Sequence, residues 1–113
     1  MENVLNDLYK VILDRQVNPQ EGSYTCYLFD KGIDKILKKV GEECSETIIA
    51  AKNGKKEETV YEISDLIYHL LVMMANEGIP LDDVMAELDS RAKKIGNLKK
   101  MRVTDKIPER VTV

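Results

Sequence analysis

The sequence predicts an all-α fold, specifically a four-helix bundle-type domain whose helices pack across a homodimer interface. Two observations predict the helices: apolar residues recur at helical spacing in four segments, and no segment shows the alternation of a half-buried strand. The third concerns the segment 57–77, which is apolar around most of its circumference and must therefore be buried on nearly all sides. A chain of 113 residues offers few neighbours for such burial, so we expect a second subunit to contribute.

Each predicted helix is followed by residues that stop a helix, such as Asn18-Pro19, Asn53-Gly54 and Gly78. The four helices are expected at residues 4–17, 33–52, 57–77 and 81–95. The segment 18–29 is rich in turn-forming and small polar residues and is predicted to be a loop. Residues 1–100 are expected to form one domain and residues 101–113 a C-terminal tail.

Composition excludes several classes of protein. With 43% hydrophobic and 33% charged residues, the chain is typical of a globular protein and not of a disordered one. No apolar stretch is long enough to span a membrane, and the first residues lack the features of a secretory signal, so a cytoplasmic location is expected. In that compartment Cys26 and Cys44 should remain reduced. The net charge of −3 argues against nucleic acid as a partner.

Positive charge is nevertheless clustered in two places. One cluster contains Lys31, Lys35, Lys38 and Lys39, and the other contains Arg91, Lys93, Lys94, Lys99, Lys100 and Arg102. Two basic patches in a mildly acidic chain are compatible with binding of a small polyanion.

The acidic residues form a more specific pattern. Glu43-x-x-Glu46 is followed, after fifteen residues, by Glu62-x-x-Asp65. Residues three apart lie on the same face of a helix, so each pair can direct two carboxylates at one point, and two pairs on neighbouring helices can form a four-carboxylate pocket. Oxygen ligands of this kind suit a hard cation such as Mg²⁺, which often shares its coordination sphere with substrate phosphates.

Alternatives to a metal site exist for each group. Glu43 and Glu46 lie beside the apolar stripe of their helix, where a solvated charged flank explains them almost as well. Glu62 and Asp65 interrupt a largely apolar helix, where unpaired carboxylates are costly and a cation or hydrogen-bond donors are expected. His69 lies one turn after Asp65, and it is either a hydrogen-bonded core histidine or a residue that orients a metal ligand. Lys39 can form a surface ion pair or contact a phosphate.

Several segments together resemble the signature of the phosphoribosyl-ATP pyrophosphatase family. They are Ser23-Tyr24-Thr25, the run from Leu28 to Gly32, the run from Lys35 to Glu43 with Glu46, and the run from Tyr61 to Leu70. The resemblance covers approximately residues 5–98 and leaves residues 101–113 outside. The wider superfamily of all-α, MazG-like nucleotide pyrophosphohydrolases shares the carboxylate pattern but not the Ser-Tyr-Thr and Lys-Gly segments.

The resemblance implies a Mg²⁺-dependent hydrolase, a phosphoribosyl-ATP diphosphatase. Its substrate would be phosphoribosyl-ATP, its products phosphoribosyl-AMP and pyrophosphate, and its reaction the second step of histidine biosynthesis. The metal ligands would be Glu43, Glu46, Glu62 and Asp65, while Glu42, Glu43 and Glu46 would be catalytic, with Glu42 an additional ligand or a residue that positions water. The lysines Lys31, Lys35, Lys38 and Lys39 would hold phosphates. A tight homodimer is also implied.

Two competing functions remain open at this point. A house-cleaning pyrophosphohydrolase acting on other nucleoside triphosphates would keep the same four carboxylates. A non-catalytic helical dimer could use the acidic patches to bind a partner or store metal. Substrate preference separates the first from the family reaction, and substitution of Glu62 and Asp65 separates the second.

Overall fold

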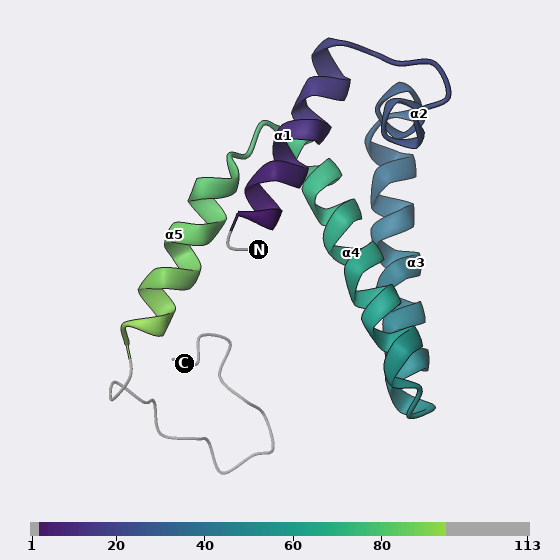
Figure 1. Cartoon of the computed structure of the whole chain (residues 1–113), viewed down its shortest axis with the longest axis vertical. Coiled ribbons are helices and arrows are strands. Elements are labelled where there is room, and N and C mark those ends of the chain that lie inside the picture. Colours follow the sequence, from purple (N-terminus) through teal and green to yellow (C-terminus); the bar gives the residue numbers. More distant parts are fainter. Residues whose placement is uncertain (1–2, 95–113) are drawn as a thin grey trace. The chain divides into compact units, whose positions relative to one another are not determined.

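The computed structural model describes residues 3–94, and this range contains five helices and no strand (Figure 1). They are α1 (Val4–Val17), α2 (Tyr24–Lys31), α3 (Ile33–Lys52), α4 (Lys56–Glu77) and α5 (Leu81–Ala92). The predicted all-α class is confirmed. The chain divides after Leu81 into two compact units, and all of α5 except its first residue belongs to the second unit. The bundle arrangement, the homodimer and the 1–100 domain stay predictions.

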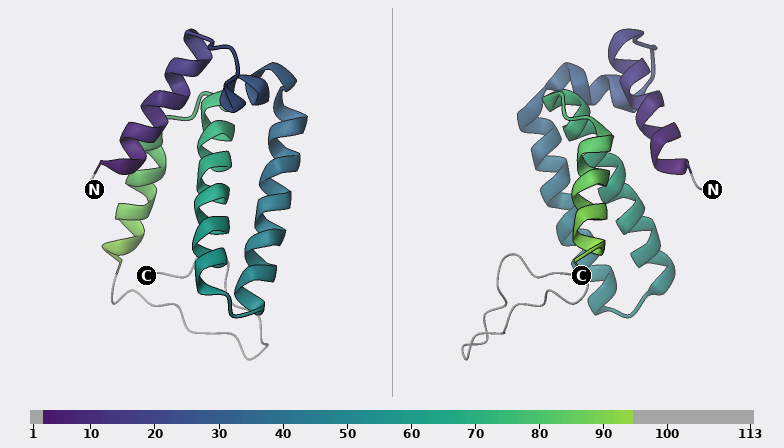
Figure 2. Two further views of the ribbon diagram at one scale, coloured as in Figure 1. Left: turned by 45° about the vertical axis from the view of Figure 1, so that its right-hand side comes forward. Right: turned by 90° about the vertical axis from the view of Figure 1, so that its left-hand side faces the viewer.

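Helices α3 and α4 form an antiparallel hairpin and lie side by side along their length (Figure 2). The predicted bounds of α3 are confirmed, and α4 begins at Lys56, one residue earlier than expected. Gly78 ends α4 in the left-handed conformation, with a φ of 70°, and its N–H donates to the carbonyls of Ala75 and Met74. Glycine adopts this backbone conformation without the steric penalty that a Cβ imposes, as expected of a helix stop.

The predicted loop over residues 18–29 holds only for residues 18–23, and the prediction was wrong for the rest, because α2 begins at Tyr24. Ser23 is its N-cap, and the Ser23 hydroxyl oxygen accepts a hydrogen bond from the backbone N–H of Cys26. Tertiary contacts stabilise this short helix: Leu28 is completely buried, and Thr25 is hydrogen-bonded to Tyr68 of α4. Eight residues, three of them aromatic, are too few to form a stable helix on their own, so the packing decides their structure.

The core of the first unit lies where α1 and α2 meet the C-terminal half of α4 and the start of α3. Its most deeply buried apolar side chains are Ile12, Leu28, Ile36 and Val72. Two long-range hydrogen bonds fix α1 at this end: the Tyr9 hydroxyl donates to the Ile79 carbonyl at 2.6 Å, and the Gln16 amide donates to the Ala75 carbonyl at 3.3 Å. The opposite end of the hairpin is covered by neither helix (Figure 1).

The second unit is described only as far as Lys94. Helix α5 ends at Ala92, so the helix predicted to reach Ile95 is shorter within the described range, and the tail 101–113 lies outside it. Along α5, Arg91 pairs with Glu87, and Lys93 pairs with Asp89 at 2.8 Å. Across the described residues, every helix is too short or too polar to cross a membrane.

Candidate metal centre

Glu43, in the middle of α3, is shared by two groups of possible metal ligands. One group joins it to Glu46 and Glu62, and the other joins it to Asp65 and His69; within each group the ligand atoms lie within 4.8 Å of one another. Both groups arise because α3 and α4 are antiparallel neighbours and each presents acidic residues spaced three apart. The structure therefore gathers the four carboxylates of the predicted pocket around Glu43.

Burial distinguishes Glu43 from the other carboxylates. Only 3% of Glu43 is exposed, whereas Glu46 on the same helix is exposed and Glu62 and Asp65 are partly buried. Burial, together with the neighbouring carboxyl groups of Glu62, Asp65 and Glu46, raises the pKa of Glu43 to about 7. Burial and the nearby Glu46 carboxyl also raise the pKa of Glu62.

Two oxygens in this cluster have no hydrogen-bond partner among the described residues: Oε2 of Glu43 and Oε2 of Glu62. A buried carboxylate oxygen without a donor is costly, and a hard divalent cation satisfies it better than a neutral donor does. The group of Glu43, Glu46 and Glu62 offers oxygen atoms alone, and Mg²⁺ prefers oxygen over nitrogen or sulfur. The donor set therefore fits Mg²⁺.

Lys39 is the lysine closest to this cluster. Its ammonium nitrogen Nζ lies 3.4 Å from Oε1 of Glu43 and 3.9 Å from Oε1 of Glu42. The ion pair that the sequence left open for Lys39 is thus present, and it reaches the buried Glu43. Glu42 is largely exposed and belongs to neither ligand group of the described residues, so its catalytic role stays a prediction.

The other predicted lysines lie elsewhere on α2 and α3. The ammonium groups of Lys31 and Lys35 each lie 5.9 Å from the centre of the Tyr27 ring, and Lys38 is exposed. The basic cluster is therefore divided between the carboxylates and an aromatic surface on α2. That these four lysines bind substrate remains a prediction.

His69 is 2% exposed and hydrogen-bonded at both ring nitrogens, as predicted for a core histidine. Nδ1 lies 2.8 Å from the backbone carbonyl oxygen of Asp65, and Nε2 lies 2.9 Å from the hydroxyl of Tyr24. Sequence reasoning missed Tyr24 as a partner, because it lies 45 residues away in a segment that the sequence predicts to be a loop.

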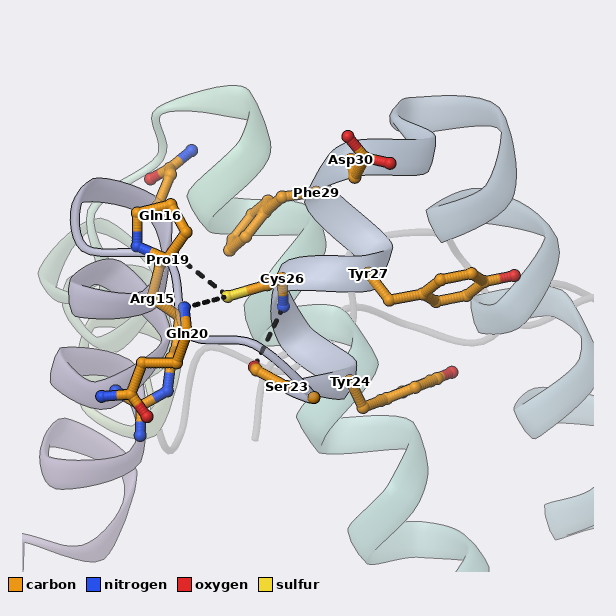
Figure 3. A pocket seen from close by; sticks show the side chains of 11 residues that line it. Arg15, Gln16, Pro19, Gln20, Ser23, Tyr24, Cys26, Tyr27, Phe29 and Asp30 are labelled. Atoms are coloured by element: carbon orange, nitrogen blue, oxygen red, sulfur yellow. Dashed lines mark hydrogen bonds between the residues drawn. The ribbon is translucent and has the colours of Figure 1, made fainter.

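Cavities lie on both sides of these elements in the described part of the chain. One, of about 190 Å³, is lined by Glu46, Glu62 and Glu58 with Ile49 and Ala50, and so adjoins the carboxylates. The other, of about 800 Å³, lies between the end of α1 and α2 and includes none of the four carboxylates (Figure 3). Volume alone therefore does not identify the site.

Cys26 faces the larger cavity, where its Sγ contacts the backbone N–H of Gln20 and the carbonyl of Arg15 (Figure 3). Hydrogen bonding to Ser23 and Gln20 lowers the pKa of the Cys26 thiol. Cys26 and Cys44 are both free in the structure, and that they stay reduced remains a prediction.

Fold and site together define a class: all-α proteins with a carboxylate cluster between two antiparallel helices. Residues 5–92 match the family model described as phosphoribosyl-ATP pyrophosphohydrolase. The chain belongs to this family, as the sequence resemblance predicted.

The relatives of the chain are of two lengths. It is 54% identical over 100 residues to the phosphoribosyl-ATP pyrophosphatase of Clostridium novyi, covering 88% of this chain and 91% of that one. It is 56% identical over 102 residues to the enzyme of the same name from Clostridium botulinum, covering 90% and 93%. It is also 60% identical over 91 residues to the histidine biosynthesis bifunctional protein HisIE of Caldanaerobacter subterraneus subsp. tengcongensis, covering 80% of this chain but only 44% of that protein.

Proposed function

We propose that the chain hydrolyses phosphoribosyl-ATP to phosphoribosyl-AMP and pyrophosphate, the second step of histidine biosynthesis, with Mg²⁺ as the cofactor. The observation that carries the proposal is a pair of buried carboxylate oxygens, on Glu43 and Glu62, that have no partner among residues 3–94. They belong to a group, with Glu46, whose possible ligand atoms are all carboxylate oxygens. Relatives that the chain matches over nearly their whole length are named for this reaction. The proposed location is the cytoplasm.

In this proposal Glu43, Glu46, Glu62 and Asp65 hold the cation. When bound, Mg²⁺ neutralises phosphate oxygens and activates water for attack on a phosphoanhydride. The protein's own part is to keep four carboxylates converged on a partly desolvated point. Asp65 is 31% exposed at its side chain and Glu46 is exposed, so the cluster is open on one side, where a phosphate chain can approach.

The lysines have separate tasks in the proposed reaction. Lys39 offsets the negative charge of Glu43 and Glu42, and it is near enough to the carboxylates to contact a phosphate. Lys31 and Lys35, beside Tyr27, together with the exposed Lys38, supply positive charge along α2 and α3 for the remaining phosphates of the substrate.

We also propose that the protein acts as a homodimer. Large apolar side chains are exposed on the half of the hairpin that α1 and α2 do not cover, namely Ile48, Ile49, Val60, Tyr61 and Ile63. Several large apolar side chains exposed on one part of a protein are typical of an interface. The occupant we propose is the same surface of a second copy, related by twofold symmetry.

The deciding experiment measures pyrophosphate release from phosphoribosyl-ATP, from ATP and from dNTPs, with Mg²⁺ or with a chelator. We expect turnover of phosphoribosyl-ATP only with the metal, and at least a hundredfold loss in Glu62→Gln and in Asp65→Asn. Glu57→Gln is the matched control, since Glu57 is an exposed carboxylate on α4 outside both ligand groups. A preference for common triphosphates would replace the proposed substrate, and wild-type rates in the two variants would remove the proposed metal centre.

A further inference from the structure

The His69 ring is fixed by more contacts than packing in a hydrophobic core requires. Two hydrogen bonds fix its two nitrogens, and two aromatic rings fix its plane: Tyr24 at 5.7 Å and Tyr68 at 5.0 Å between ring centres, both edge to face. With 98% of the residue shielded from solvent, water does not compete for these bonds. One orientation of the imidazole is therefore strongly favoured.

The partners also determine which nitrogen carries the proton. The backbone carbonyl of Asp65 can only accept, so Nδ1 carries the hydrogen and donates it. In the neutral ring the lone pair of Nε2 then accepts the hydroxyl hydrogen of Tyr24. Neither nitrogen has a free lone pair for a cation, even though the side chain lies within reach of Glu43 and Asp65.

The donating edge of the ring faces Asp65. Besides its bond to the backbone carbonyl, Nδ1 lies 3.3 Å from the carboxylate oxygen Oδ1 of the same residue. The carboxylate oxygen Oδ1 thus lies against the ring edge that carries the Nδ1 hydrogen, and this contact limits the rotation of the carboxylate. Helix α2 is thereby connected to Asp65 through Tyr24 and His69.

We propose that His69, oriented by Tyr24, is a positioning residue for the Asp65 carboxylate and is not itself a metal ligand. The inference rests on the proposed function in one respect, that Asp65 holds the cation. It assigns α2 a role as the element that sets the geometry of a ligand on α4. Loss of the Tyr24 hydroxyl should allow the His69 ring to rotate. Loss of the His69 ring should allow the Asp65 carboxylate to rotate.

The test uses Mn²⁺ alone as the probe, with affinity measured from the electron paramagnetic resonance signal of free Mn²⁺. We expect binding to weaken about 10- to 100-fold in His69→Phe, as is common when an outer partner of a metal ligand is removed. His69→Asn keeps an N–H near the position of Nδ1 and should recover most of the affinity. Tyr24→Phe removes only the hydroxyl and should weaken binding less than His69→Phe does.

Tyr9→Phe is the matched control. It also removes a tyrosine hydroxyl that donates a long-range hydrogen bond, here to Ile79, at the end of the hairpin away from the carboxylates. Both tyrosine variants should lower the Tm by several degrees, about 4–8 °C per broken bond of average strength. Only Tyr24→Phe should change the Mn²⁺ affinity, which separates positioning from general loss of stability.

Three results would overturn the proposal. Unchanged Mn²⁺ affinity in a folded His69→Phe, or in Tyr24→Phe if the former does not fold, would show that the pair has no influence on the ligand. Pulsed electron paramagnetic resonance that detects a directly bound nitrogen would make His69 a ligand. Failure of the wild-type protein to bind Mn²⁺ would remove the metal centre as well, which distinguishes failure of the proposed function from failure of this inference alone.

Discussion

The two halves of α4 differ in how much of their apolar surface the chain itself buries. In the C-terminal half, Leu71, Val72 and Ala75 are buried beneath α1 and α2. In the N-terminal half, α4 packs against α3 within the described part of the first unit, and Val60 and Tyr61 remain 57% and 67% exposed. The C-terminal half of α4 therefore belongs to a buried core. The N-terminal half carries apolar residues that the described part of the first unit leaves exposed.

The carboxylates lie where these halves meet. Glu62 and Asp65 precede His69, the first fully buried residue of the C-terminal half, by one to two turns. The buried core around the C-terminal half of α4 can therefore hold the carboxylates in position. The exposed N-terminal half leaves them accessible. A rigid frame beside an accessible site is what a cation-binding centre requires.

The largest effect on folding is expected in the buried half. Leu71→Ala should lower the free energy of unfolding by about 2–5 kcal/mol, because it opens a cavity in a packed core. Val60→Ala, in the exposed half, should cost less than about 1 kcal/mol at protein concentrations where the chain is monomeric. Urea unfolding of both variants measures the difference, and equal costs at every protein concentration would contradict the contrast between the halves.

Glu43, which packs beside the boundary between the two halves of α4, should make the free energy of unfolding depend on pH. Glu43 binds its proton more tightly in the folded chain, with a pKa of about 7 against an ordinary 4.5, so the folded state holds more protons between these values. The free energy of unfolding without metal should therefore fall as the pH rises from 4.5 through 7, by about 3 kcal/mol at most. Urea unfolding between pH 5.5 and 8 measures this trend.

Two comparisons test the assignment of this pH dependence. Glu43→Gln removes the titrating group and should flatten the trend. Mg²⁺ should oppose it, because in the proposed centre the cation would bind the ionised carboxylates and stabilise the folded chain mainly above pH 7. A stability that rises with pH in the metal-free wild-type protein would show that Glu43 is not in a desolvated, negatively charged environment.

The exposed half should govern self-association. Val60→Asp places a charge on the proposed dimer surface and should weaken the dimer more than tenfold, because an unpaired carboxylate in an apolar interface is costly. Val17→Asp is the matched control, since Val17 is even more exposed but lies at the end of α1. Sedimentation at several protein concentrations distinguishes the two, and equal dissociation of both variants would mean that another surface forms the dimer.

Much of the hairpin could be predicted from the sequence, because its signals are local. The apolar spacing and the stops at Asn53-Gly54 and Gly78 gave the ends of α3 and α4 to within one residue. The three-residue spacing of the acids also placed each pair on one face of its helix. Spacing could not tell that Glu43 is buried and Glu46 exposed, because that depends on how closely α4 packs against each of them.

The elements that depend on distant contacts could not be predicted. Helix α2 is too short to be stable alone, and its capping serine was an ambiguous signal within a segment rich in turn-forming residues. The bond between Tyr24 and His69 joins residues far apart in the sequence, so no periodicity reveals it. Family resemblance pointed to the Ser-Tyr-Thr segment, but the reason for its position becomes visible only when α2 is seen against α4.

The smallest effect on stability is expected at Gly41, which lies on α3, the helix against which α4 packs. A Cβ built at Gly41 meets no atom of the described residues within 4 Å, so their packing does not require a glycine at this position. Gly41→Ala should therefore raise the free energy of unfolding by about 0.5–1 kcal/mol, by reducing the backbone freedom of the unfolded chain.

Ser45→Ala, at another exposed position of α3, should raise stability less, because serine is nearer than glycine to alanine in helical preference. Unfolding midpoints of the two variants, compared at low and high protein concentration, test this order. A loss of stability in Gly41→Ala only at high concentration would place a second copy against α3 beside the carboxylates. In that case the N-terminal half of α4 and the carboxylate cluster would lie in one interface between two copies. The difference in burial between the two halves of α4 would then exist only in the isolated chain.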